Sequence, residues 1–365
     1  MARLRERILK FSKVIAVNLV VTAGLLLVLN WLCGVILRKT ADPSRAELPN
    51  YQDERDVARK IFIDYDRVKH RYEPFSEWRA LSYDGETTHI DQQGLRIVPG
   101  APATGLSVKF FGGSTMWGEG SDDARTIPAY VQSQHPEWMV ANHSQLAYNS
   151  MQNLTSLIVL LSKGDSADVV VFYDGVNDAA FLCPSEISVP GHRLVPSFQK
   201  RIYGGSLDFA LIFLDNMFIS NMRRLVQRVK GETPGSSAYN CENNPEKVDA
   251  IANGMIRNWE MAHELVTTRG GEFIAVLQPM AYVGNPKTDH VKLDETLGRN
   301  MVAVYKVLQE KLAAKNYPWV INLTSQFDGD QYIYIDFCHV SPAGNKLIAD
   351  KISEFVLAQQ STDVK

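Results

Sequence analysis

The chain has 365 residues, of which 45% are hydrophobic and 22% are charged, as is typical of a globular protein with a large core. This length allows one large domain or two small ones. The formal net charge is −3, and no long basic run follows the N-terminal segment, which excludes a protein that binds nucleic acid through its phosphate backbone.

The chain begins with a basic segment, residues 1–13, and continues with an apolar segment, residues 14–37. The apolar segment contains no charged residue, and about 24 residues of helix are roughly 36 Å long, enough to cross a bilayer. A signal peptide is the alternative, but its apolar core is shorter, about 7–15 residues, and a small-residue cleavage site follows it. No clear site of that kind follows here. The sequence therefore predicts an uncleaved, single-pass membrane anchor.

Positive charge is distributed unevenly around this anchor. Five Lys and Arg residues precede it, whereas Arg38, Lys39 and Arg45 follow it closely. Because the more positive flank stays on the cytoplasmic side, we expect residues 1–13 in the cytoplasm. The rest of the chain beyond the anchor is expected to be extracytoplasmic, which means periplasmic in a Gram-negative bacterium.

Two short regions separate the anchor from the main domain. Residues 38–72 are polar and predict a juxtamembrane linker with a short helix. Residues 73–105 contain D-G and Q-G turn signals between extended pieces, which indicates a small antiparallel β element. We expect this element to pack on the edge of the main domain, residues 106–360.

Strand-like and helix-like segments alternate five times in the main domain. The strongest strand signal is "ADVVVFYDG", whose continuous β-branched run is typical of a strand buried on both faces. The alternation predicts a three-layer α/β/α domain with a mostly parallel, five-stranded, flavodoxin-like sheet. Such sheets bind ligands beyond the carboxyl ends of their strands.

One insertion, about residues 180–245, lies between the third predicted strand and its helix. It is rich in Pro, Gly and Asn, and its apolar patch, residues 207–219, is too short and too interrupted by Asp to be a second membrane span. Because the insertion leaves the sheet at the ligand-binding end, we predict that it forms a cap over the site.

The chain has four cysteines, one of which, Cys33, falls in the anchor. Cys183 and Cys241 lie at the two ends of the insertion, which a cap must bring together, so we predict a disulfide between them. Cys338 is the competing partner, and free buried cysteines are the simpler alternative. An extracytoplasmic space permits a disulfide, and the cysteine spacings do not match a zinc site.

Polar residues follow four of the five predicted strands. In chain order they are Ser114 after the first strand, Ser144 after the second, Asn177 after the third, and Asp336 and His339 after the fifth. Taken singly, each has an ordinary interpretation, such as a helix cap or a turn residue. Because the carboxyl ends of parallel strands meet at one edge of the sheet, together they predict a site with a nucleophile, an acid–base pair and hydrogen-bond donors.

In this order the segments resemble the four sequence blocks of the SGNH hydrolases, also called the GDSL family. The blocks are "GGSTMWGEG", "NHSQLAYNSMQ", "GVND" and "DFCH", and the resemblance extends from about residue 108 to residue 357. Two positions depart from the family pattern. Gly113 replaces the usual Asp, and Ser144 stands where a glycine usually provides an N–H group for the oxyanion hole.

The resemblance implies a serine esterase that needs neither a metal nor a cofactor. Ser114 would be the nucleophile, His339 the acid–base catalyst and Asp336 the residue that orients the imidazole. The N–H groups of Ser114 and Ser144 and the side-chain amide of Asn177 would form the oxyanion hole.

The anchor and its orientation favour a substrate outside the cytoplasm. We therefore expect the protein to remove acyl groups, acetyl groups in particular, from an extracytoplasmic glycan or a related ester. Three alternatives stay open: an O-acyltransferase with the same triad, a lipase or thioesterase whose apolar patch grips an acyl chain, and a non-catalytic glycan-binding protein. The expected partners are the ester substrate and the membrane, and not nucleic acid.

Overall fold

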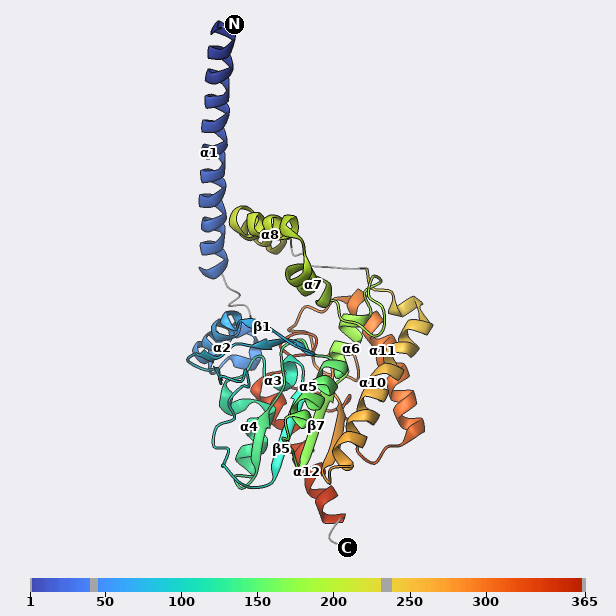
Figure 1. Cartoon of the computed structure of the whole chain (residues 1–365). Helices are drawn as coiled ribbons and strands as arrows, with labels where there is room; N and C mark the ends of the chain where they lie inside the picture. Colours follow the sequence, from blue (N-terminus) through green and yellow to red (C-terminus); the bar gives the residue numbers. More distant parts are fainter. Residues whose placement is uncertain (1, 40–44, 231–237, 363–365) are drawn as a thin grey trace. The chain divides into compact units, whose positions relative to one another are not determined.

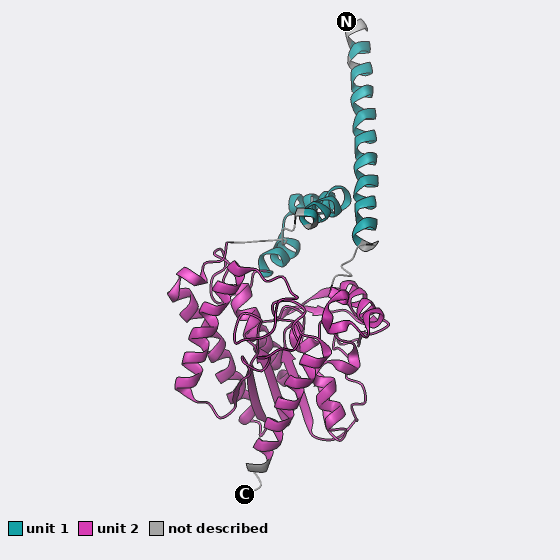
Figure 2. Ribbon diagram, turned by 180° about the vertical axis from the view of Figure 1, so that it is seen from behind, with its two compact units in different colours: residues 1–42, 194–237 teal, residues 43–193, 238–365 magenta. Residues whose placement is uncertain are grey.

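The computed structural model of the chain describes residues 2–39, 45–230 and 238–362. It divides into two compact units (Figure 2), of which unit 1 comprises residues 1–42 and 194–237 and unit 2 comprises the rest of the chain. Residues 40–44 of the predicted linker and residues 231–237 of the predicted insertion lie outside the described residues.

Unit 2 is built around a five-stranded sheet in which every neighbouring pair of strands is parallel (Figure 1). Its strands are β5 (Ser107–Gly112), β6 (Met139–Asn142), β7 (Val169–Asp174), β8 (Glu272–Leu277) and β9 (Val320–Asn322). Their spatial order is β6-β5-β7-β8-β9. The second strand along the chain therefore stands at the edge beside the first, which is the flavodoxin-like order. The predicted fold class is confirmed.

Helices cover both faces of this sheet. One core cluster joins alternate residues of the strands, such as Val170 and Phe172, to α5 (Ser150–Ser162), α10 (Pro245–Thr267) and α11 (Glu295–Lys315). The other cluster joins the intervening residues to α4 (Ile127–Gln134) and α12 (Pro342–Thr362). Strand β7 is buried at all of its positions because apolar side chains leave it on both faces.

Small elements precede the sheet in unit 2. They are η1 (Arg45–Glu47), η2 (Pro49–Tyr51), α2 (Arg55–Arg67), β1 (His70–Glu73), β2 (Glu77–Ala80), β3 (Tyr83–Asp84) and β4 (His89–Ile90). Strands β1 and β2 pair antiparallel, as do β3 and β4. Single bridges connect Arg96 to Ile90 on one side and to Asn142 of β6 on the other, so this small β element is attached to the sheet edge.

The buried guanidinium of Arg96 also holds the loop that follows the first strand of the sheet. Its Nε donates to Asp123 Oδ1 at 2.8 Å, and its other nitrogens donate to the carbonyl oxygens of Gly118 at 2.8 Å and Ser121 at 2.6 Å. This loop contains α3 (Ser114–Trp117) and η3 (Asp123–Arg125). A single buried cation thus satisfies several loop carbonyls that would otherwise lack a partner.

Unit 1 contains four helices among the residues that the structure describes. They are α1 (Ala2–Lys39), α7 (Val195–Tyr203), α8 (Ser206–Phe218) and α9 (Ser220–Lys230). In α1, residues Arg5–Leu37 are long and apolar enough to cross a membrane. Helices α8 and α9 pack against α1 (Figures 1 and 2). The central part of the insertion therefore shares a unit with the N-terminal helix, and its function as a cap stays a prediction.

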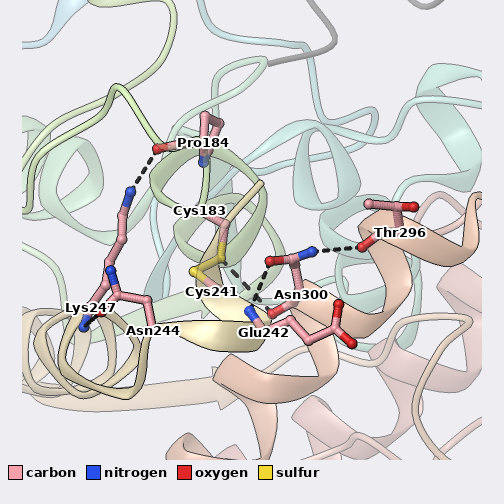
Figure 3. The surroundings of a disulfide bond; sticks show 8 residues. All are labelled: Cys183, Pro184, Cys241, Glu242, Asn244, Lys247, Thr296 and Asn300. Atoms are coloured by element: carbon pink, nitrogen blue, oxygen red, sulfur yellow. Dashed lines mark hydrogen bonds between the residues drawn. A yellow bond between two sulfur atoms is a disulfide. The ribbon is translucent and has the colours of Figure 1, made fainter. Parts of the chain in front are cut away.

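The two ends of the insertion meet in unit 2. Cys183, directly after α6 (Val176–Leu182), and Cys241, at the start of η4 (Cys241–Asn243), are joined by a disulfide, with their Cα atoms 5.2 Å apart (Figure 3). The N–H of Asn240 donates to the carbonyl oxygen of Cys183 at 3.1 Å. The pair favoured by the sequence is therefore bonded, and Cys338 is a free, buried cysteine.

Candidate active site

Ser114 is the first residue of α3, and one residue, Gly113, separates it from the end of β5. The preceding Gly113 lies so close to neighbouring loops that a Cβ atom there would be 2.2 Å from Asn177 Nδ2 and 3.1 Å from the carbonyl oxygen of Tyr148. Gly118 ends the short helix with a φ of +100°, a conformation that favours glycine. Any side chain at position 113 would therefore require Asn177 to move, which gives a physical reason for glycine here.

Three of the predicted site residues come together. Ser114 Oγ lies 2.7 Å from His339 Nε2, and His339 Nδ1 lies 2.7 Å from Asp336 Oδ2. The other carboxylate oxygen, Asp336 Oδ1, accepts the backbone N–H groups of Cys338 at 2.9 Å and His339 at 2.8 Å. The turn "DFCH" therefore fixes the acid against the imidazole through its own backbone, and the nucleophile reaches the opposite ring nitrogen.

Two residues that the sequence analysis missed complete the surroundings of His339. The Glu119 side chain, only 5% exposed, has its Oε2 atom 3.0 Å from His339 Nε2. Its other oxygen accepts Arg45 Nη1 at 2.7 Å, and Arg45 Nη2 lies 3.3 Å from Asp336 Oδ2. Arg45 thus bridges the two carboxylates that flank the imidazole, while Ser114 and Glu119 face the same ring nitrogen.

The charges of this cluster determine its ionisation. Burial alone would raise the pKa of Glu119, but the charges of His339 and Arg45 lower it to about 2. Asp336 keeps 31% of its side chain exposed, and His339 and Arg45 hold its pKa below the usual range of an aspartate against the opposing effect of burial. For His339, burial would lower the pKa, but Asp336 and Glu119 outweigh it and raise the pKa well above the usual value of histidine.

The position of Ser144 does not support its predicted function. Its N–H donates to Asn142 Oδ1 at 3.1 Å, and the residue is fully buried, so this N–H is not available to an oxyanion. The prediction followed sequence position alone, which does not reveal that the Asn142 side chain caps the loop.

A residue three positions later, Ala147, has an unusual backbone conformation. Ala147 has a φ of +65°, in the left-handed region that favours glycine. No acceptor for its N–H is found within the described part of the chain. The carbonyl of the next residue, Tyr148, accepts Asn177 Nδ2 at 2.6 Å and lies beside Gly113. The segment 147–148, rather than Ser144, therefore borders the nucleophile loop.

Asn177 is the second residue of α6 and is half-buried. One N–H of its amide is donated to Tyr148, and the second N–H of that group can still donate to a ligand. The neighbouring Asp178 accepts Ser150 Oγ at 2.5 Å and the Ser150 N–H at 3.1 Å, so its carboxyl group fastens α5 to this loop.

Two further buried carboxyl groups, those of Asp174 and Asp178, lie at the carboxyl end of β7. Asp174, the last residue of β7, accepts Trp259 Nε1 at 2.8 Å and Asn153 Nδ2 at 2.7 Å. Burial and the negative charge of Asp178 raise the pKa of Asp174, and burial likewise raises the pKa of Asp178. The hydrogen-bond donors to Asp174 and Asp178 are neutral groups, which distinguishes these two residues from Glu119 and Asp336 around His339.

One group of side chains near the nucleophile has atoms close enough to hold a metal ion: Asp336, Cys338 and His339. The ligand form of a cysteine is the thiolate, whereas burial raises the pKa of Cys338 to about 11 and keeps it protonated. Asp336 and His339 are already engaged with each other. The arrangement therefore fits a proton-transfer chain better than a metal site.

No protein-family model and no curated protein matches this chain. Similar solved structures include a lipolytic protein of the G-D-S-L family from Veillonella parvula, with 13% identity, a TM-score of 0.38, and coverage of 68% of this chain and 96% of that chain. A carbohydrate acetylesterase from Sinorhizobium meliloti has 13% identity and a TM-score of 0.37, with coverage of 69% and 99%. A GDSL-like lipase from Bacteroides thetaiotaomicron has 15% identity and a TM-score of 0.36, with coverage of 69% and 89%.

The first and third of these proteins carry the name of the family that the four sequence blocks resemble. At such identities and TM-scores the similarity assigns no activity. The fold assignment rests on the strand order, and the description of the site rests on the distances between its side chains.

Proposed function

We propose that this chain is a serine hydrolase of the SGNH type that cleaves carboxylic esters. The observation that carries the proposal is the continuous chain of contacts from Ser114 Oγ through the His339 ring to Asp336, with both distances at 2.7 Å. Nucleophile, base and orienting acid in mutual hydrogen-bond reach are the signature of nucleophilic catalysis.

Each group has one task in the proposed reaction. His339 Nε2 takes the proton of Ser114 Oγ as this oxygen attacks the ester carbonyl, and it returns a proton to the leaving alcohol. Asp336 stabilises the imidazolium that forms between these two steps. Water then attacks the acyl carbon and gives a proton to His339, and His339 passes this proton to Ser114 Oγ as the acyl group leaves as a carboxylic acid.

The developing oxyanion needs donors beside Ser114. We assign them to the N–H groups of Ser114 and Ala147 and to the remaining N–H of the Asn177 amide. The contacts of Gly113 with Asn177 and Tyr148 support this assignment, because they bring the three loops together at the nucleophile. Loss of one such donor typically costs about 2.7–4 kcal/mol of transition-state stabilisation.

The substrate proposed is an acylated, in particular an acetylated, glycan or related ester outside the cytoplasm. Two features support this location: the apolar helix α1, preceded by the more basic flank, and the disulfide between Cys183 and Cys241. Disulfides persist in oxidising spaces such as the periplasm and are rare in the cytosol.

The test uses the purified full-length chain with a series of p-nitrophenyl esters of increasing acyl length and a panel of acetylated glycans. We expect turnover to fall with acyl length and acetate to appear from at least one glycan. The same assays are carried out on the variant Ser114→Ala. Its matched control is Ser133→Ala, at an exposed serine of α4. A folded protein that releases acid from none of these esters would refute the proposal, and acetyl transfer to a sugar without free acetate would identify a transferase.

A further inference from the structure

Helix α8 exposes apolar side chains along its whole length. None of its residues is buried. Leu207 is 74% exposed, Phe209 68% and Phe213 55%, and Leu211, Leu214 and Met217 are exposed as well. A contiguous apolar surface of this kind is rare on a protein surrounded by water and marks an interaction site.

One residue of α1, Asn30, binds the turn between α8 and α9. Its Nδ2 donates to the last carbonyl groups of α8, those of Asn216 at 3.1 Å and Met217 at 3.0 Å. Its Oδ1 accepts the first N–H groups of α9, those of Asn221 at 2.9 Å and Met222 at 3.4 Å. A single buried amide therefore satisfies backbone groups at the end of one helix and the start of the next.

The contact at Asn30 lies within the apolar segment of α1. Asn30 precedes the end of that segment, Leu37, by seven residues, which is about 10 Å along a helix. At such a depth no water is present to satisfy helix ends, and an asparagine is tolerated only when it finds a partner. The reciprocal hydrogen bonds between Asn30 and the α8–α9 turn meet both requirements.

The packing and one ion pair at the turn agree with this environment. Gly34 is so close to the turn that a Cβ atom there would lie 2.7 Å from Asn221 Nδ2. Asp215 is paired with Arg223 through two contacts of 2.9 and 2.7 Å. Pairing reduces the free energy required to bring a charged side chain into hydrocarbon.

We propose that α8 lies in the extracytoplasmic leaflet beside α1, held there by the hydrogen bonds of Asn30 with the α8–α9 turn, and that lipid acyl chains cover its exposed face. The inference rests on the proposed membrane anchor and is independent of the esterase activity. The insertion then serves as a second membrane attachment of the chain in addition to α1.

The experiment places a fluorophore on single introduced cysteines of the full-length protein in lipid nanodiscs. The positions are Phe213→Cys on α8, Leu25→Cys on α1 and Phe75→Cys in unit 2, where Phe75 is 80% exposed. The wild-type chain is the blank, because its cysteines are buried or disulfide-bonded. Quenching by nitroxide lipids is compared with quenching by aqueous iodide.

We expect the labels at positions 25 and 213 to be quenched at least threefold more by the nitroxide lipids than the label at position 75, and to be protected from iodide. Asn30→Leu is then introduced into the proteins labelled at 213 and at 25; it keeps α1 apolar but removes the hydrogen bonds with the α8–α9 turn. The label at 213 should become accessible to iodide, and the quenching of the label at 25 should not change. An unquenched label at 25 would refute the anchor. If the label at 25 is quenched but the label at 213 is accessible to iodide, the membrane placement of α8 is refuted and the anchor is not. Crosslinks between two copies of the protein at position 213 would refute the placement of α8 in the same way.

Discussion

Two pairs of carboxyl groups lie near the carboxyl ends of the strands in unit 2, and their ionisation differs. Glu119 and Asp336 face His339 and Arg45, and their pKa values lie below the usual range. Asp174 and its neighbour Asp178 are bonded by neutral donors, and their pKa values are raised.

The comparison shows that burial by itself favours the protonated form and that a cation in contact reverses this preference. The first pair is kept ionised, as stabilisation of an imidazolium requires. The second pair fastens β7, α5 and α10 to one another through Trp259, Asn153 and Ser150. In the proposed mechanism the first pair of carboxyl groups therefore has a catalytic task, whereas the second pair has a structural one.

Removing the charge of Asp336 should have the largest effect. Asp336→Asn leaves the shape of the side chain but no longer stabilises the imidazolium or selects the tautomer with the proton on Nδ1, so kcat should fall by about four orders of magnitude. Stopped-time assays with p-nitrophenyl acetate measure this loss. Asp53→Asn, at an exposed aspartate, is the control and should be neutral. A loss of less than about tenfold at Asp336 would mean that the residue does not act on His339.

Glu119→Gln should shift the pH dependence of kcat/KM and have a smaller effect on the maximal rate. The activity requires neutral His339, and a carboxylate 3.0 Å from its ring raises the pKa of the imidazole. Removing this charge lowers that pKa, so the rising limb of kcat/KM should move to lower pH by at least about one unit. Arg45→Gln removes a positive charge from the same cluster and should move the limb to higher pH.

A matched control exists on the surface. Glu137 lies 3.7 Å from His135, and its side chain is 66% exposed. Glu137→Gln should leave the pH profile unchanged. Shifts of the same sign in the Glu119 and Arg45 variants would indicate structural damage instead of an electrostatic effect on His339.

The smallest effect on activity is expected for Asp174→Asn. Because the pKa of Asp174 is raised in the folded chain, the stability it contributes is fully present below the ordinary pKa of an aspartate and is lost as the pH rises through the raised value. The variant cannot ionise, so its free energy of unfolding should fall less than that of the wild type between about pH 5 and about pH 8. Urea titrations at several pH values measure this difference, and kcat should stay within about twofold. If the free energy of unfolding depends on pH in the same way in the wild type and in the variant, Asp174 is not protonated in the folded state.

Much of this arrangement could be predicted because it follows the chain locally. The alternation of strands and helices predicts the sheet. The meeting of Ser114, Asn177 and "DFCH" follows because each of them comes after a strand of that sheet. We propose Ala147, rather than the predicted Ser144, as the oxyanion donor after β6, and the left-handed backbone of Ala147 gives no glycine signal in the sequence.

The contacts that escaped prediction join residues far apart in sequence. Arg45 reaches Asp336 across 291 positions, and Asn30 reaches Asn221 across 191. Hydrophobic periodicity reports burial within one element and carries no information on such pairs. Glu119 had a local signal, an acid within the glycine-rich nucleophile block, but its direction depends on the turns at Gly118 and Gly120.

The most direct test of the account is covalent labelling of the nucleophile. The full-length protein is treated with a fluorophosphonate, in which an activated serine oxygen displaces fluoride from phosphorus, and the adduct is located by peptide mass spectrometry. We predict one adduct, on Ser114, that is absent from Ser114→Ala and forms far more slowly in Asp336→Asn. A folded protein that forms no adduct, or one that is labelled on a different serine, would contradict the assignment of Ser114, His339 and Asp336 as the catalytic triad.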